Sequence, residues 1–323
     1  MSQDVMSKAA MTTTTLGDGG LLLRQQANRF INLVTSYQNF LNVIRTVPVN
    51  HPKGEIDKID LTTPVTRKAT ENTNETTTSQ AAFSKVQYDT VKTVTCFDIS
   101  MEAEEDSIEG KAFRNTLMKV FTDRVGTDMA MLAIEGDSSL GGSDAASLLL
   151  KSYNGAHVLT ASCPNILDAN GLGVSLKLFK DGLNKLPVRY KGRLRPSLRW
   201  FIAPNPKEDF DYAYGNRATS GGDTVFTQAP NLAPFGIPLE ECPLIPVDLT
   251  IGTAATDGSF LMLSAPSNFM WFVQRRIQIH FEFQPRSDTT EVTIYMRTAF
   301  QIEDLNAMVK VRGVSADAAT AYA

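Results

Sequence analysis

The stretch that most constrains the fold is residues 110–136, because it predicts one long helix. Apolar residues recur there at three- and four-residue steps: Phe113, Leu117, Val120, Phe121, Val125, Met129 and Leu132. This spacing forms one apolar stripe along a helix. Acidic residues precede the stretch, where a helix N-terminus favours negative charge, and Gly136 is a candidate C-cap. At about 1.5 Å per residue the helix spans roughly 40 Å, which is long for a globular domain.

Length and charge exclude several classes of protein. The chain has 323 residues, and a single core stops growing at about 250–300 residues, so we expect two lobes or an elongated body. Its net charge is −4 without a basic stripe, which argues against tight nucleic-acid binding. The three cysteines, Cys96, Cys163 and Cys242, lie far apart and are expected to be free thiols of a reducing cytoplasm. The longest apolar run, residues 129–134, is too short to cross a bilayer.

The chain before residue 100 predicts an arm followed by a long ribbon. Residues 21–47 form a second helical stripe that ends at Pro48, and its amide-rich opposite face suits contact with protein about as well as contact with water. Residues 55–65 and 83–99 are rich in β-branched and aromatic residues, which favours two strands. A two-stranded ribbon is not stable in isolation. It therefore lies either over its own domain or, as an arm, across a neighbouring subunit.

The rest of the chain predicts an α/β lobe and a closing pair of strands. In residues 165–265 we expect helices over 174–186 and 205–214 and buried strands over 198–203 and 260–263. In residues 276–284 and 291–301 apolar and polar residues alternate, which predicts two antiparallel strands with one face buried under the long helix. A turn and one short strand are expected within residues 302–313.

Patterns that would carry catalysis are weak. Residues 136–143 nearly match a phosphate-binding loop, but Gly142 stands where the lysine is needed. The histidines, His51, His157 and His280, are scattered without metal-ligand spacing. The carboxylate pairs Asp57/Asp60 and Glu240/Glu241 and the basic clusters Arg275/Arg276 and Arg193/Arg195/Arg199 are expected on loops, on strand faces or in salt bridges. We predict no catalytic, cofactor-binding or metal-binding residue, and no enzyme.

The order of these parts resembles the major capsid proteins of tailed bacteriophages, which have the Hong Kong ninety-seven capsid fold. Three stretches carry the resemblance: residues 128–137; residues 198–204 with 236–239 and 243–246; and residues 269–280 with 298–302. The fold class is then α+β. The resemblance implies an N-terminal arm (1–48), an extended β-hairpin loop (49–100), a peripheral domain (101–164, spine helix 110–136), an axial domain (165–265), and peripheral closing strands with a C-terminal tail (266–323).

The resemblance also implies a function and partners. Copies of the chain would form hexamers and pentamers of an icosahedral shell, with axial domains at the symmetry axes and the extended loop over the adjacent subunit. The shell would enclose double-stranded DNA without sequence-specific binding, in a virion head assembled in the host cytoplasm, with a portal and a decoration protein as further partners. Contacts between subunits are expected at eight positions: Arg67, Lys68, Thr70, Glu71, Asn74, Phe30, Tyr37 and Phe40.

Two alternatives and two finer expectations accompany this prediction. The same fold would suit an encapsulin-like nanocompartment shell that encloses protein cargo, and a two-lobed α/β enzyme with a dimerisation arm is a rival from another class. Some members of the fold join a loop lysine to a neighbour's asparagine. For Lys68, Lys85 and Asn306 we expect no such link. Residues 1–20 lack the apolar heptads of a coiled coil, so we expect a separate scaffolding protein.

Overall fold

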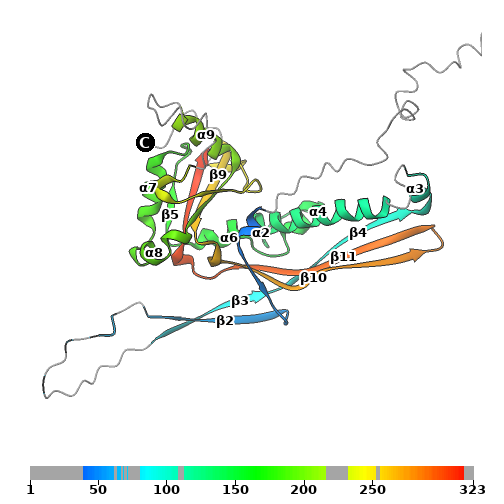
Figure 1. The fold of residues 1–323 in the computed structure, drawn as a ribbon, viewed down its shortest axis with the longest axis horizontal. Coiled ribbons are helices and arrows are strands. Elements are labelled where there is room, and N and C mark those ends of the chain that lie inside the picture. Colours follow the sequence, from blue (N-terminus) through cyan, green and yellow to red (C-terminus); the bar gives the residue numbers. More distant parts are fainter. Residues whose placement is uncertain are drawn as a thin grey trace, which may run out of the picture. The chain divides into compact units, whose positions relative to one another are not determined.

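The computed structural model describes residues 39–61, 64–66, 68, 71, 81–107, 113–215, 232–251 and 255–315 (Figure 1). Backbone contacts divide the chain into two units. The described parts of the first unit are residues 96–107, 113–124 and 280–292. The second unit holds the remaining described residues, including the hairpin and the α/β lobe.

The predicted long helix is confirmed as α4, Phe113–Glu135. Its buried residues all lie in the C-terminal half, from Val125 to Ile134. The acidic residues before it belong partly to a separate short helix, α3 (Met101–Glu105), which Ser100 caps by accepting a hydrogen bond from the Ala103 amide at 3.2 Å. In the first unit the ring of Phe121 stacks on Phe97 with centroids 3.6 Å apart.

Gly136 follows α4, but its role differs from that of a left-handed C-cap, since its φ is not positive. A Cβ at Gly136 would lie 2.3 Å from the Tyr153 carbonyl oxygen. A Cβ at Gly155 would lie 2.7 Å from the Gly136 nitrogen, and the Gly155 amide donates to the Gly136 carbonyl at 2.7 Å. The two glycines therefore let two backbone segments approach closely. Between them in the chain lies α5 (Ala145–Leu150), and after Gly155 come α6 (Ala156–Leu159) and η3 (Thr160–Ser162).

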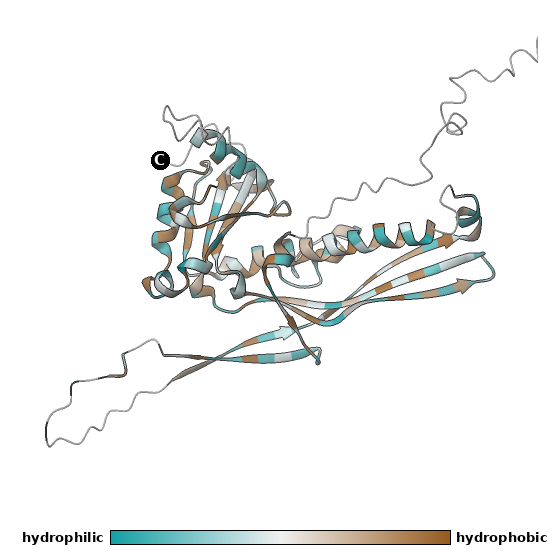
Figure 2. Ribbon diagram, viewed as in Figure 1, coloured by the Kyte–Doolittle hydropathy of each residue, from teal (hydrophilic) through white to brown (hydrophobic). Residues whose placement is uncertain are grey.

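A four-stranded sheet has the order β1-β10-β11-β4, with β1 Arg45–Pro48, β10 Phe269–Gln284, β11 Thr289–Ile302 and β4 Val91–Ser100. Along β11 the expected alternation is confirmed, since Val292, Ile294 and Met296 are buried. Figure 2 shows hydrophobic and hydrophilic residues alternating along β10 and β11. The expectation for β10 was wrong: Ile279, Phe281 and Phe283 are 38%, 52% and 51% exposed.

The arm helix predicted over residues 21–47 is also corrected. Residues 21–38 lie outside the described residues; residues 39–43 form a short helix, α2 (Asn39–Val43), and the chain then enters β1. β1 runs parallel to β10, with Arg45 opposite Met270 and Pro48 opposite Val273. The β-branched Thr46 and Val47 suit a strand, and β1 is an edge strand, where proline is tolerated.

The predicted ribbon is a hairpin of two strands, β2 (Lys53–Asp60) and β3 (Ala82–Asp89), paired antiparallel. The strand predicted over residues 83–99 is interrupted at Thr90. The amide and hydroxyl of Thr90 both donate to the Pro52 carbonyl, at 2.7 and 2.9 Å. These bonds close the base of the hairpin, and the chain continues as β4 in the four-stranded sheet.

The predicted α/β lobe contains the sheet β5-β12-β9-β6-β7, and β8 pairs with β9. Its strands are β5 Ile166–Asp168, β6 Arg199–Ile202, β7 Leu239–Glu241, β8 Leu249–Ile251, β9 Ala255–Ser264 and β12 Val309–Ser315. Its helices are α7 Leu176–Lys185, α8 Val188–Arg193 and α9 Pro204–Gly215. Two short 3-10 helices, η4 Arg195–Ser197 and η5 Pro234–Gly236, also belong to the lobe. Two others, η6 Pro266–Asn268 and η7 Leu305–Ala307, flank the long strands. The helices of residues 174–186 and 205–214 and the strands of 198–203 and 260–263 are thus found, with shifts of a few residues at their ends.

One boundary of the lobe was wrong. β12 was expected among the peripheral strands, but it pairs antiparallel with β9 and parallel with β5. A strand in the middle of the sheet is therefore supplied by residues 309–315, beyond the predicted boundary at 265. The core between this sheet and its helices includes Phe179 of α7, Trp200 of β6 and Phe210 of α9. The ring of Phe179 meets those of Trp200 and Phe210 edge-on, at 5.1 and 5.0 Å.

Candidate inter-subunit surface

The β2–β3 hairpin is anchored to its own chain by one of its two faces. Val86 is buried and packs with Ile56 and Tyr88 against Met270 and Phe272. The Tyr88 ring stacks on that of Phe272 with centroids 4.5 Å apart. This face holds the hairpin in place without a second subunit.

The opposite face of the hairpin carries large apolar side chains that its own chain leaves exposed. Ile59 and Phe83 lie opposite each other in the register and are 68% and 74% exposed. Leu61 and Val65, which follow β2 in the sequence, are 57% and 50% exposed. Because Ile56 and Ile59 are three residues apart, they point to opposite faces of the strand. Large exposed apolar side chains on a strand are typical of a surface that another protein covers. We call Ile59, Phe83, Leu61 and Val65 the hairpin surface.

Charged residues share the face of Ile59 and Phe83. Lys85 donates to Glu55 at 2.5 Å and lies 4.0 Å from Asp57. The hydrogen bond from Lys85 lowers the pKa of Glu55, and the bond to Glu55 raises the pKa of Lys85. This face of the hairpin is thus apolar toward the tip and charged toward the base.

The exposed part of β10 is a second candidate surface. Ile279, Phe281 and Phe283 alternate along the strand and so share one face. β1 pairs with β10 over Met270–Val273 and does not reach these three residues.

Of the eight residues predicted at subunit contacts, five lie outside the described residues: Arg67, Thr70, Asn74, Phe30 and Tyr37. Lys68 and Glu71 are exposed. Phe40 is 1% exposed, and its ring packs against Phe201 and Phe269 of its own chain with centroids 5.5 and 5.6 Å apart. Its side chain belongs to the chain's own core, because α2 turns it inward.

The hairpin surface was missed by the sequence interpretation, which considered the residues of the hairpin tip. The available signal was the three-residue spacing of Ile56 and Ile59. Side chains alternate between the two faces of a strand, so Ile56 and Ile59 cannot both lie on the buried face.

Several of the groups considered for catalysis have structural partners. Asp137 accepts hydrogen bonds from the amide and hydroxyl of Ser139, so the loop that resembles a phosphate site is a side-chain-bonded turn. Glu240 pairs with Arg199 at 3.6 Å, and Glu241 pairs with Lys207. Cys96, Cys163 and Cys242 are free thiols, as expected. Within the described ranges no group of metal-ligating side chains is gathered, and no helix there is long and apolar enough to cross a membrane.

Comparison with known sequences finds no matching family model. The chain is similar to a protein named "Putative prophage capsid protein YqbE" from Bacillus subtilis (strain 168). The two are 27% identical over 317 residues, which are 96% of this chain and 99% of that protein.

Solved structures show the fold. The chain resembles the capsid of a native GTA particle, with a TM-score of 0.69, 12% identity and coverage of 95% of this chain and 100% of that one. It also resembles the satellite phage P4 procapsid (TM-score 0.63, 16% identity, 98% of each chain). A third likeness is to the SrpI encapsulin complex of Synechococcus elongatus PCC 7942 (TM-score 0.60, 9% identity, 99% and 98%). The chain has the fold of these shells, which is the fold expected above.

Proposed function

We infer that this chain is a phage major capsid protein, whose work is to build a closed shell from copies of itself. The fold alone suits a phage capsid or a nanocompartment, because an encapsulin shares it. The sequence similarity to a prophage capsid protein over nearly the whole chain favours the phage capsid over the nanocompartment and over a two-lobed enzyme. The observation that carries an assembly role in this molecule is the hairpin surface, whose apolar side chains are 50–74% exposed in the single chain.

The hairpin surface is proposed to lie on a neighbouring subunit, with the exposed part of β10 as a second covered surface. Burying apolar area contributes about 25 cal/mol per Å², so several large side chains repeated around a shell add up to a substantial driving force. The isolated subunit keeps its fold because Val86 and Tyr88 hold the opposite face of the hairpin.

Replacing Ile59 and Phe83 together by serine tests this role. Each residue is more than half exposed, so the change should leave the free energy of unfolding within about 0.5 kcal/mol, and the subunit should still melt cooperatively. When the chain is expressed with its scaffolding protein, shell formation should fall sharply, as seen by size exclusion and negative-stain microscopy. Val188→Ser is the matched control, because Val188 of α8 is 80% exposed outside this surface. Shells at the parent yield from the double variant would refute the role of the hairpin surface.

The partners named from the resemblance are part of this proposal. Copies of the chain would form hexamers and pentamers with the α/β lobe as the axial domain, within a virion head assembled in the host cytoplasm. A separate scaffolding protein, a portal and a decoration protein would join it. The solved P4 procapsid includes a size determination protein, which supports a second protein in assembly here. Uniform closed shells from the chain expressed alone would argue against the scaffold.

The enclosed cargo distinguishes a phage capsid from a nanocompartment shell. The net charge of −4 suits a wall that encloses DNA without gripping it. Nuclease-protected DNA in purified particles is expected, whereas an enclosed enzyme would favour the nanocompartment. We propose no covalent link through Lys68, Lys85 or Asn306. In support, Lys85 is paired with Glu55, and the side chain of Asn306 donates to Asp304 at 3.2 Å.

A further inference from the structure

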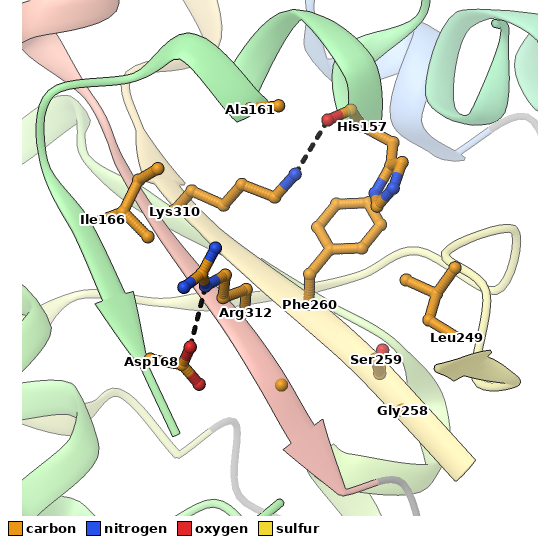
Figure 3. Close-up of a pocket in the computed structure, with 11 residues that line it drawn as sticks. His157, Ala161, Ile166, Asp168, Leu249, Gly258, Ser259, Phe260, Lys310 and Arg312 are labelled. Carbon is orange, nitrogen blue, oxygen red and sulfur yellow. Dashed lines mark hydrogen bonds and ion pairs between the residues drawn. The ribbon is translucent and has the colours of Figure 1, made fainter. Parts of the chain in front are cut away.

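The second face of the sheet in the α/β lobe carries a cavity that the assembly role does not use. Strand alternation places Val309 and Val311 of β12 in the core with the helices, and Lys310 and Arg312 on the other face. The cavity on that face has a volume of about 520 Å³, within the usual range of about 300–1,000 Å³ for small-molecule sites. Lys310, Arg312, His157, Phe260, Ile166 and Leu249 are among its lining residues (Figure 3).

Lys310 is a buried cation without a carboxylate partner among the described residues. The residue is 4% exposed. Its ammonium group donates to the His157 carbonyl at 2.8 Å and lies 5.1 Å from the centre of the Phe260 ring. Burial, with a smaller effect of nearby Arg312, lowers the pKa of Lys310 to about 8. A lysine ammonium has three N–H donors, so the one hydrogen bond leaves donors for a further acceptor.

Arg312 adds a second positive charge, which Asp168 balances. Its Nε donates to Asp168 at 2.8 Å, and its side chain is 62% exposed, which puts it at the mouth of the cavity. Among the lining residues that the structure describes, Lys310 and Arg312 are cations and Asp168 is the carboxylate, and Asp168 pairs with Arg312.

One buried polar atom of the lining, Nδ1 of His157, has no hydrogen-bond partner in the part of the chain that the structure describes. Buried polar atoms are nearly always hydrogen-bonded, so this atom calls for a partner. Phe260, Ile166 and Leu249 give the same cavity an apolar wall.

We propose that this cavity binds a small organic anion, in which a phosphate or carboxylate head is joined to an apolar body. The head would accept hydrogen bonds from the ammonium of Lys310 and the guanidinium of Arg312. The body would lie against Phe260, Ile166 and Leu249. A polar atom of the ligand or its bound water would meet His157 Nδ1.

The test is calorimetric titration of the purified full chain with three probes: phenyl phosphate, benzoate and inorganic phosphate. Phenyl phosphate or benzoate should bind more tightly than inorganic phosphate, and the better of the two identifies the head group. Lys310→Met should weaken binding of the preferred probe by roughly tenfold or more, because hydrogen bonds to charged groups are among the strong ones. Arg312→Gln should weaken it to a smaller extent.

The variants separate a loss of binding from a loss of folding. Replacing a buried charge by an apolar side chain of similar size is often neutral or stabilising, so Lys310→Met should fold, which thermal melting checks. Lys180→Met is the matched control, because Lys180 is an exposed residue of α7, the helix on the other face of the sheet. The proposal is overturned if no probe binds at millimolar concentration. It is also overturned if inorganic phosphate binds as tightly as the organic probes, or if Lys310→Met binds like the parent.

Discussion

The α/β lobe and the β2–β3 hairpin place their large apolar side chains in opposite ways. In the lobe Trp200 and Phe179 are 1% and 0% exposed, inside a core that the lobe's own helices complete. In the hairpin Ile59 and Phe83 are 68% and 74% exposed. The two regions have similar apolar residues, so hydrophobicity alone does not decide burial. The difference is whether the same chain supplies a covering layer, and it separates residues that stabilise the subunit from residues that we propose join subunits.

The largest expected effect comes from truncating the core of the lobe. Trp200→Ala should lower the free energy of unfolding by about 3–5 kcal/mol, because it leaves a cavity between Phe179 and the sheet. Phe83→Ala removes a ring of comparable size from the hairpin and should change the free energy of unfolding by less than about 0.5 kcal/mol. Chemical denaturation of both variants measures the contrast. Equal losses would mean that the hairpin surface is also part of the subunit core.

Smaller changes in stability, opposite in sign, are expected when glycines in two neighbouring helices of the lobe are replaced by alanine. In α7 a Cβ at Gly182 would lie 2.7 Å from the buried ring of Trp200, so Gly182→Ala should cost about 1–3 kcal/mol through overpacking. In α8 a Cβ at Gly192 meets nothing within 4 Å, so Gly192→Ala should stabilise by up to about 1 kcal/mol through helix propensity. Thermal melting should move the two midpoints in opposite directions, and a loss at both sites would contradict this account of the packing.

The smallest effect is expected at the charged end of the hairpin. Glu55→Gln removes the ion pair with Lys85, whose two side chains are 40% and 57% exposed, so the melting temperature at neutral pH should not change measurably. Because Lys85 lowers the pKa of Glu55, any contribution is present at neutral pH and is lost as the pH falls below the ordinary value of 4.5. A clear drop at neutral pH, absent at low pH, would show that charge as well as apolar packing anchors the hairpin.

Elements with a strong local pattern could be predicted from the sequence. The apolar stripe of residues 113–132 gave α4, and the alternation of Val292, Ile294 and Met296 gave β11. Both signals arise within one element and need no knowledge of its neighbours. The order of elements was enough to indicate the capsid fold.

Features that depend on distant partners could not be predicted in the same way. The pairing of β12 with β5 and β9 joins residues far apart in the sequence, and the break at Thr90 depends on the carbonyl of Pro52. Phe40 looked like part of an exposed arm, but it meets rings from β6 and β10. The alternation along β10 predicted burial at Phe281 and Phe283, although the single chain leaves both exposed. In the assembly proposed above, a neighbouring subunit would supply the covering layer for these residues.

The apolar character of the hairpin surface has a consequence for how shells respond to temperature. Burying such surface near 25 °C is driven almost entirely by entropy, and the driving force weakens on cooling. Shells that depend on Ile59 and Phe83 should therefore loosen in the cold, while the helix-covered lobe of each subunit remains folded. Chilling would then be a gentle way to take particles apart into intact subunits and warming a way to reassemble them.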